Sequence, residues 1–232
     1  MANIKFGAIV TDMRGSLGGT AFSRGGGGAI ARNAPKPVNP RSATQSSRRA
    51  VLAQLAQRWG RVLTEPERTA WRAYAAGTAW TNKVGTSATI SGLAAYVRLN
   101  SLLMMAGVAV QDTAPTSVGH AGTPTFTITA EPTDGHIVVA QPSEPFDKNI
   151  TGSRMIFFQH VAANPGQLAI PGNKRYLGTI VGNVSTPPTF PNDLDVIFPV
   201  ATGQRIFVTG IFIDQTYRIG NDYSVSALAA NP

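Results

Sequence analysis

The sequence has 232 residues, 43% of them hydrophobic and 14% charged, so the chain can bury a core and is unlike a wholly disordered protein. It contains no cysteine, which excludes disulfide bonds, thiolate metal sites and cysteine nucleophiles and fits synthesis in a reducing cytoplasm. The net charge of +8 is uneven, because residues 1–112 hold 14 Lys and Arg against four Asp and Glu, whereas residues 113–232 hold six against eight.

This asymmetry predicts that the first half of the chain contacts an anionic partner, either nucleic acid or an acidic protein surface. The alternative is that the arginines are only the solvated faces of helices. The first residues lack the pattern of a signal peptide, and no window of 18 apolar residues exists. We therefore expect a soluble protein with no membrane partner that is not exported through a signal peptide.

Residues 1–41 are rich in Gly and Pro, with basic residues spread between them. Glycine loses much backbone entropy on ordering, and closely spaced prolines favour an extended chain. We predict an extended basic arm that does not fold alone and is ordered by a neighbouring subunit or by packing back on its own body. Its candidate contact residues are the basic and aromatic side chains Arg14, Phe22, Arg24, Arg32, Lys36 and Arg41.

Residues 42–111 predict a module of three helices. Ser42 or Thr44 can cap the first helix, whose apolar residues recur every three or four positions up to Leu63. Thr64-Glu65-Pro66-Glu67 has the form of a capping box, which starts the second helix. A third helix is predicted around residues 92–106. Such a small module buries little surface and needs a partner surface to be stable.

Large apolar residues are predicted to form the seam between these helices. Two tryptophans of the seam lie among arginines, as in proteins that bind single-stranded nucleic acid, but the helical spacing favours a place in the core. The seam residues are Leu55, Trp59, Trp71, Tyr74 and Tyr96.

Residues 112–122 predict a linker, and residues 123–232 predict a β-rich domain with no helical pattern. Seven short strands separated by turn clusters are typical of an immunoglobulin-like or fibronectin type III-like sandwich, and the lack of a Cys pair favours the fibronectin-like form. The whole chain is thus predicted to be α+β, with an extended arm, a three-helix module and a seven-stranded sandwich. The strands are predicted at 125–130, 136–141, 154–160, 175–181, 195–200, 205–213 and 223–228.

The sequence offers no motif for catalysis, for a cofactor or for a metal. The three histidines His120, His136 and His160 lack metal-ligand spacing, and Asp193 with Asp195 indicates a solvated edge more than a calcium site. The glycine run at 25–28 is not followed by the Lys and Ser or Thr of a phosphate-binding loop. We predict that the protein is not an enzyme and has no cofactor.

Several short motifs follow one another in the first hundred residues. They are Arg14-Gly15-Ser16-Leu17-Gly18-Gly19-Thr20-Ala21-Phe22-Ser23-Arg24, the stretch from Ala31 to Arg41 with Gln45, then Trp59, Leu63-Thr64, Arg68 and Trp71, and last Ser91-Gly92 with Tyr96, Arg98, Leu99 and Asn100. In this order they resemble the opening of a group of tailed-phage and prophage structural proteins. The uninterrupted glycine run departs from that pattern.

The resemblance implies a structural protein of a tailed-bacteriophage virion. Its partners would be the major capsid protein, portal or neck proteins, tail subunits or further copies of itself. We expect the arm and helices to anchor the chain while the sandwich points outward, with capsid decoration slightly preferred over a neck or tail position. The alternatives are a basic nucleic-acid-binding protein and a carbohydrate-binding adhesin with Tyr176 and Tyr217 exposed in a loop groove.

Overall fold

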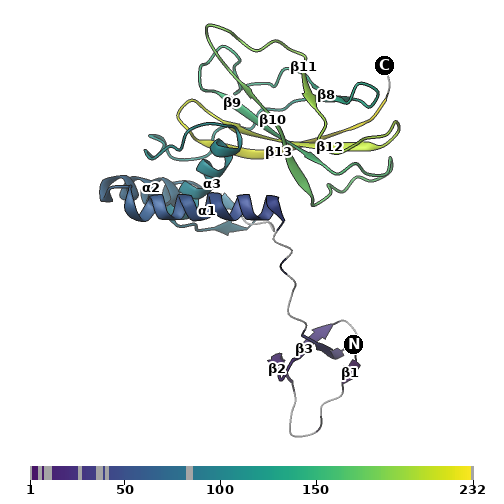
Figure 1. Ribbon diagram of the computed structural model, residues 1–232. Coiled ribbons are helices and arrows are strands. Elements are labelled where there is room, and N and C mark those ends of the chain that lie inside the picture. Colours follow the sequence, from purple (N-terminus) through teal and green to yellow (C-terminus); the bar gives the residue numbers. More distant parts are fainter. Residues whose placement is uncertain are drawn as a thin grey trace. The chain divides into compact units, whose positions relative to one another are not determined.

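The computed structural model describes residues 2–4, 7, 12–25, 28–34, 39, 42–81 and 86–230. The chain divides into two compact units, residues 1–47 and 48–232, which are described one at a time. Over the described residues the fold is mixed α+β, with three helices and several antiparallel sheets (Figure 1).

The first unit contains a small antiparallel sheet in the strand order β1-β4-β3-β2. The extended segments expected in this part of the chain pair with one another in this sheet. A tight turn joins β2 to β3, where Gly18 and Gly19 have φ values of 56° and 82°, the positive values that a two-residue hairpin turn requires. The strands are β1 (Ala2–Ile4), β2 (Gly15–Leu17), β3 (Thr20–Gly25) and β4 (Gly28–Asn33).

Three capped helices follow, α1 (Ala43–Arg61), α2 (Glu65–Gly77) and α3 (Gly92–Met105). At the start of α1 the Ser42 hydroxyl accepts the Gln45 amide at 3.4 Å. Thr64 donates its amide and its hydroxyl to Glu67 Oε2 at 2.7 and 2.8 Å, which is the return half of the predicted capping box. The Ser91 hydroxyl accepts the Ala94 amide at 3.2 Å at the start of α3.

The residues after α3 form two antiparallel sheets, β10-β9-β12-β13 and β11-β8-β7. A two-stranded pair, β5 (Trp80–Thr81) and β6 (Ser87–Ala88), lies between α2 and α3. The strands of the two larger sheets are β7 (Ile128–Glu131), β8 (His136–Val139), β9 (Arg154–His160), β10 (Lys174–Val181), β11 (Asn192–Asp195), β12 (Arg205–Ile213) and β13 (Ile219–Leu228).

One predicted strand is displaced, since the chain pairs at Asn192–Asp195 rather than at 195–200. The buried Gln159 side chain explains the shift. Its Oε1 accepts the amides of Ile197 and Phe198 at 2.6 and 3.0 Å, and its Nε2 donates to the Phe198 carbonyl at 3.0 Å. These backbone groups are satisfied by a side chain and do not need a strand partner.

The two sheets share a hydrophobic core, an arrangement consistent with a β-sandwich. Strands β7 and β8 contribute Ile128, Ile137 and Val139 to it, and β9 contributes Met155 and Phe157 from the other sheet. The edge-to-face pair of Phe126 with Phe157, whose ring centroids are 5.2 Å apart, joins the two layers.

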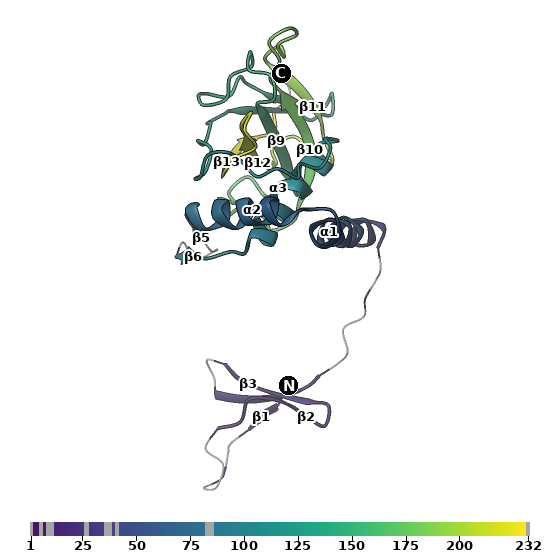
Figure 2. The same cartoon turned by 90° about the vertical axis from the view of Figure 1, so that its left-hand side faces the viewer.

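The opposite face of the four-stranded sheet packs against the helices (Figure 2). Alternate residues of β9 divide between the two faces, so that Ile156 and Phe158 lie in the helical core while Met155 and Phe157 lie in the inter-sheet core. The sheet is therefore the partner surface that the small helical module needs. Residues 48–232 form one compact unit, and the domain boundaries expected at residues 41, 111 and 122 remain predictions.

Candidate interaction sites

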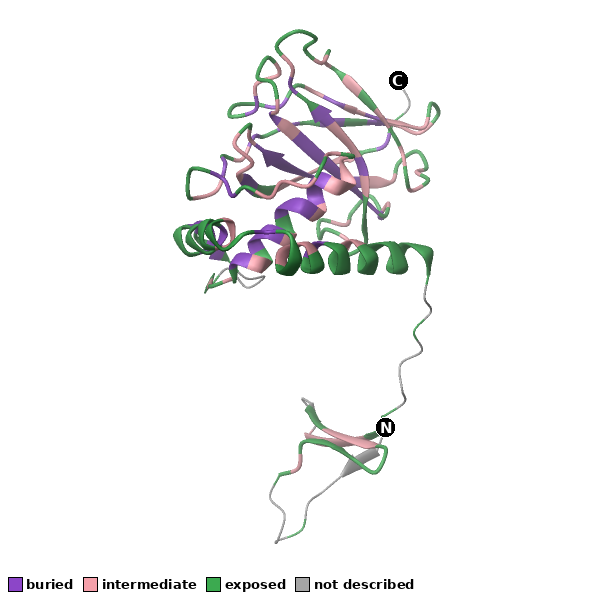
Figure 3. Cartoon of the chain, turned by 60° about the vertical axis from the view of Figure 1, so that its left-hand side comes forward, coloured by how far each residue is buried: buried purple, intermediate pink, exposed green. Residues whose placement is uncertain are grey.

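The described side chains in the sheet of the first unit are exposed or half-buried. No residue of this unit whose side chain the structure describes is buried (Figure 3). Side chains two apart on a strand share a face, so Phe22 and Arg24 lie on one face of β3. The register pairs Ala21 with Arg32 and Ser23 with Ile30, which puts Arg32 and Ile30 on the other face.

The basic residues of this sheet meet little opposite charge. Arg14 Nε lies 3.1 Å from Asp12 Oδ2, and Arg24 Nη1 lies 4.0 Å from the same oxygen. The Arg14 and Arg24 side chains remain 72% and 60% exposed, and Arg32 is exposed as well. Lys36 and Arg41, the other two expected contact residues, lie outside the described residues.

The predicted seam residues meet in the core between the helices and the sheet. The Tyr96 ring contacts Trp59 at 5.6 Å and Trp71 at 5.4 Å between centroids, and Trp71 contacts Tyr74 at 5.8 Å. Trp71 and Tyr96 are fully buried, so neither ring offers a face for a base to stack on. Leu55 is the one fully buried residue of α1 and belongs to the same core.

Asp112 is an important residue that the sequence interpretation assigned only to the linker. Arg58 of α1 donates to both of its carboxylate oxygens, Nε to Oδ1 at 2.8 Å and Nη2 to Oδ2 at 2.6 Å. The Tyr96 hydroxyl donates to Oδ1 at 3.0 Å, and Trp71 Nε1 donates to the Asp112 carbonyl at 2.6 Å. Asp112 thus ties all three helices to the segment that leads into the sheets.

The charges in this cluster support one another. The hydrogen bonds from Arg58, followed by that from Tyr96, hold the pKa of Asp112 below its ordinary value despite partial burial. Burial and the nearby carboxylate raise the pKa of Tyr96. The cluster is therefore an ionised carboxylate with a guanidinium and a neutral phenol, an arrangement that holds helices in place.

The histidines take structural roles in the second unit. His120 lies between two carbonyl oxygens, with Nδ1 at 3.1 Å from that of Ile219 and Nε2 at 2.7 Å from that of Ala79. His136 Nδ1 lies 3.1 Å from the exposed Asp195 carboxylate. Within the described part of the chain, no three His, Asp or Glu side chains gather closely enough to hold a metal ion.

His160 belongs to a buried chain of hydrogen bonds across three strands. Nδ1 lies 2.6 Å from the Pro171 carbonyl and must donate to it, so Nε2 of the neutral ring accepts from the Thr209 hydroxyl at 2.8 Å. The Thr209 hydroxyl then accepts from Ser224 at 2.7 Å. Burial lowers the pKa of His160, which keeps the ring neutral.

The two tyrosines proposed for glycan binding are not exposed. Tyr176 and Tyr217 are partly buried and pack against the helical core, and the Tyr217 ring also lies 5.8 Å from the Arg154 guanidinium. The adhesin hypothesis expected exposed rings in a loop groove, so this part of it is wrong.

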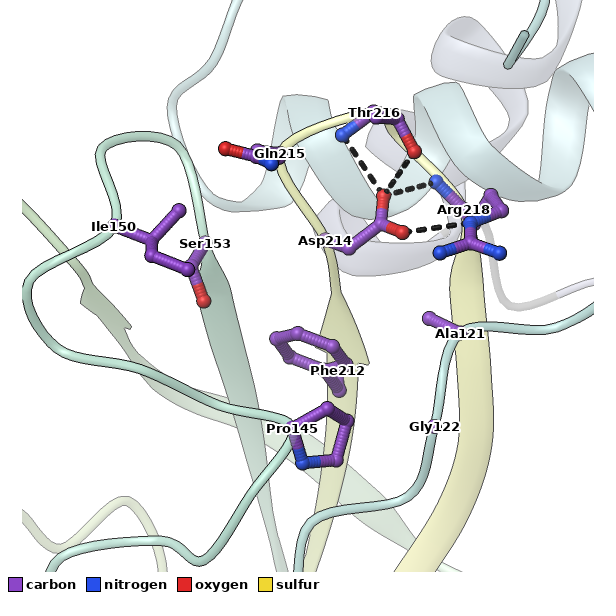
Figure 4. Close-up of a pocket in the computed structure, with 10 residues that line it drawn as sticks. All are labelled: Ala121, Gly122, Pro145, Ile150, Ser153, Phe212, Asp214, Gln215, Thr216 and Arg218. Atoms are coloured by element: carbon purple, nitrogen blue, oxygen red, sulfur yellow. Dashed lines mark hydrogen bonds and ion pairs between the residues drawn. The ribbon is translucent and has the colours of Figure 1, made fainter. Parts of the chain in front are cut away.

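A small pocket opens beside the turn between β12 and β13 (Figure 4). Its volume is about 190 Å³, less than the roughly 300–1,000 Å³ typical of drug-sized ligand sites. Its lining combines apolar residues with an ion pair, Arg218 Nε to Asp214 Oδ2 at 2.7 Å. The sequence interpretation gave none of the residues that line it a role in a site.

Comparisons with known proteins leave the family open. The chain matches no protein-family model, no curated protein and no solved structure. None of the helices in the part of the chain that the structure describes is both long and apolar enough to cross a membrane.

Proposed function

We propose that this chain is a non-enzymatic structural protein of a tailed-bacteriophage virion, anchored through its N-terminal sheet to other virion proteins. The observation that carries the proposal is the lack of any buried residue among the described side chains of the first unit. A sheet of this size needs a hydrophobic face packed against something to be stable. In the particle, neighbouring subunits would supply that surface.

The two faces of the N-terminal sheet each offer a bulky apolar side chain beside an arginine. Phe22 with Arg24 occupies one face, and Ile30 with Arg32 occupies the other. Subunits packed on both sides would bury the apolar residues and pair the arginines with carboxylates, which form strong charge-assisted hydrogen bonds. The partner surfaces we propose are therefore apolar with acidic rims.

This distribution favours a protein partner over nucleic acid. A nucleic-acid-binding surface gathers its basic residues on one face or along one groove, whereas Arg24 and Arg32 point to opposite sides of the sheet. Duplex DNA binding that weakens steeply with salt would support the nucleic-acid alternative instead.

We further propose that the C-terminal strands form a seven-stranded sandwich of the fibronectin type III-like kind. Numbered from β7, the first, second and fifth strands share one sheet, and the third, fourth, sixth and seventh share the other. In immunoglobulin constant-type domains the fourth strand belongs to the sheet of the first; here β10 pairs with β9 instead. We propose that this domain projects outward, with capsid decoration preferred over a neck or tail position.

The test is incorporation into particles assembled in the host. We expect the chain lacking residues 1–41 to remain folded, as judged by circular dichroism and thermal unfolding, but to be absent from purified particles analysed by mass spectrometry. A normal amount of the truncated chain in particles would overturn the proposal.

A charge-reversal pair sharpens this test. The double variant R24E/R32E changes the charge of the sheet, whereas K148E/R175E makes the same change of charge in the second unit. We expect the first to be depleted from particles and the second to be incorporated normally. Equal incorporation of both variants would show that the two arginines do not contribute to anchoring. Strong hydrogen-exchange protection of β3 and β4 in the isolated monomer would contradict their need for a partner.

A further inference from the structure

The pocket beside the β12–β13 turn is built from three separate segments. Ala121 and Gly122 border one side, Ile150 and Ser153 border the opposite side, and the turn from Asp214 to Arg218 lies between them (Figure 4). All of these residues belong to the second unit, so the pocket does not depend on how the N-terminal sheet is placed.

The carboxylate in the pocket is already satisfied. Asp214 Oδ1 accepts from the Thr216 amide at 2.9 Å, from the Thr216 hydroxyl at 2.8 Å and from the Arg218 amide at 2.9 Å. Its Oδ2 accepts from Arg218 Nε at 2.7 Å. Asp214 is therefore a fixed support for the turn and positions the guanidinium of Arg218.

The polar groups of the pocket that remain without a partner are mainly hydrogen-bond donors. Arg218 uses Nε for Asp214, and its two Nη groups, on a side chain that is 32% exposed, make none of the hydrogen bonds or ion pairs found among the described residues. The Ser153 hydroxyl is buried, with the residue only 2% exposed, and it has no hydrogen-bond partner in the described chain. A buried hydroxyl without a partner is costly, so a ligand atom that reaches it would relieve that cost.

The charge and the apolar lining of the pocket further restrict the chemistry of the ligand. Arg218 carries the positive charge and Asp214 the negative charge among the residues that line the pocket. Phe212 and Pro145 supply an apolar floor, and the Ile150 side chain adds a partly exposed wall. Free guanidinium nitrogens prefer a carboxylate or phosphate, and the small apolar floor favours a short carbon chain.

We infer that this pocket binds a carboxylate carried on a short apolar group, such as an acidic side chain of another protein or a small free carboxylic acid. The Arg218 Nη groups hold the carboxylate, the Ser153 hydroxyl donates to it, and its carbon chain packs on Phe212 and Pro145. This site goes beyond the proposed virion function and stands without it.

The experiment is an NMR titration of the full chain at constant ionic strength. One series adds sodium propionate, a second adds N-acetyl-glutamate methylamide, and a third adds sodium chloride as a reference. We expect saturable shifts of the amides of Ser153, Gln215 and Thr216 and of the Arg218 Nε–H with at least one carboxylate. Binding of both probes indicates recognition of any small carboxylate, whereas binding of the blocked glutamate alone indicates a protein side chain.

The most informative variant is S153A. It removes a hydroxyl that makes no hydrogen bond in the structure, so folding stays intact, and we expect the affinity to fall roughly tenfold because a bond to a charged group is lost. R218Q should abolish binding, and R175Q, a change of an exposed arginine elsewhere in the same unit, should leave it unchanged. If neither probe gives saturable shifts, or if S153A binds as tightly as the original chain, the inference is wrong.

Discussion

Arg58 and Asp112 form a bidentate ion pair, with nitrogen–oxygen distances of 2.8 and 2.6 Å. The pair joins the first helix to the segment that follows the third helix. Asp112 is the one carboxylate in the sequence between Glu67 and Glu131. The pair stands at the end of the aromatic cluster of Trp59, Trp71 and Tyr96, so it holds the helical layer together where that layer meets the rest of the unit.

We expect D112A to lower the free energy of unfolding by about 2 kcal/mol, since it removes the Arg58 pair and the acceptor of Tyr96. The loss is smaller than for a fully buried pair because the Arg58 side chain is 37% exposed and water screens part of the attraction. Urea unfolding with an unchanged m-value measures it. The matched control is D193A, an exposed aspartate, which should change stability by less than about 0.5 kcal/mol. Equal effects of the two variants would contradict the role given to Asp112.

The buried His160 predicts a pH dependence of stability. Burial lowers its pKa from the ordinary value of 6.5 in the folded protein, so the unfolded chain takes up a proton below about pH 6.5 that the folded chain does not. The free energy of unfolding should therefore fall as the pH drops from 7 towards 5, by at most about 1.4 kcal/mol per pH unit from this residue.

The variant H160Q should flatten that slope, because glutamine does not titrate. Urea unfolding at pH 7, 6 and 5 provides the comparison. A slope that survives in H160Q would show that another group is responsible.

Local sequence patterns predicted the helices and the central strands well, because the decisive signals are local. The predicted capping residues Ser42 and Thr64 lie at the helix starts, and β9 and β12 have the predicted bounds. Both strands have adjacent apolar residues in place of an apolar–polar alternation, which also indicates strands buried on both faces. This pattern predicts that another element covers the second face of the sheet. It does not predict that the helices are that element.

The misplaced elements depend on distant or overlooked interactions. Residues 196–200 look like a strand, but Gln159, which lies 38 and 39 positions before Ile197 and Phe198, accepts the amide groups of those two residues, and no local pattern reveals this. The N-terminal hairpin could have been predicted, since Gly18-Gly19 between two extended segments is a two-residue turn signal. The abundance of Gly and Pro instead favours an extended arm that does not fold alone. The contacts of Asp112 and the lining of the pocket at Arg218 both come from segments that lie far apart in the sequence, so local patterns do not predict them.

Two helical glycines should respond to alanine with opposite signs. A Cβ at Gly92 would lie 2.9 Å from the Arg72 backbone nitrogen, where α3 crosses α2, whereas a Cβ at Gly60 of α1 has nothing within 4 Å. We expect G92A to destabilise the protein by about 1–3 kcal/mol through forced separation of the helices. G60A should stabilise it by up to about 1 kcal/mol through helix propensity. Thermal unfolding distinguishes the two, and a loss of stability in G60A would contradict the open space assigned to that position.

The turn between β2 and β3 gives the sharpest test of the N-terminal sheet. Gly18 has a φ of 56°, a conformation that asparagine tolerates and β-branched residues avoid. We expect G18V to weaken the hairpin by about 1–2 kcal/mol, whereas G18N should keep it or strengthen it, because Asn-Gly is a preferred two-residue turn.

Carbon-13 secondary shifts of Ser16 and Ala21, which pair across β2 and β3, report the fraction of paired hairpin in each variant. The shifts should move towards random-coil values in G18V and stay in place or become more strand-like in G18N. Because none of the side chains described in this sheet is buried, a change of this size at one turn should noticeably alter its population in the isolated chain. If both variants retain identical shifts, the positive φ at Gly18 is not what sets the pairing of β2 with β3.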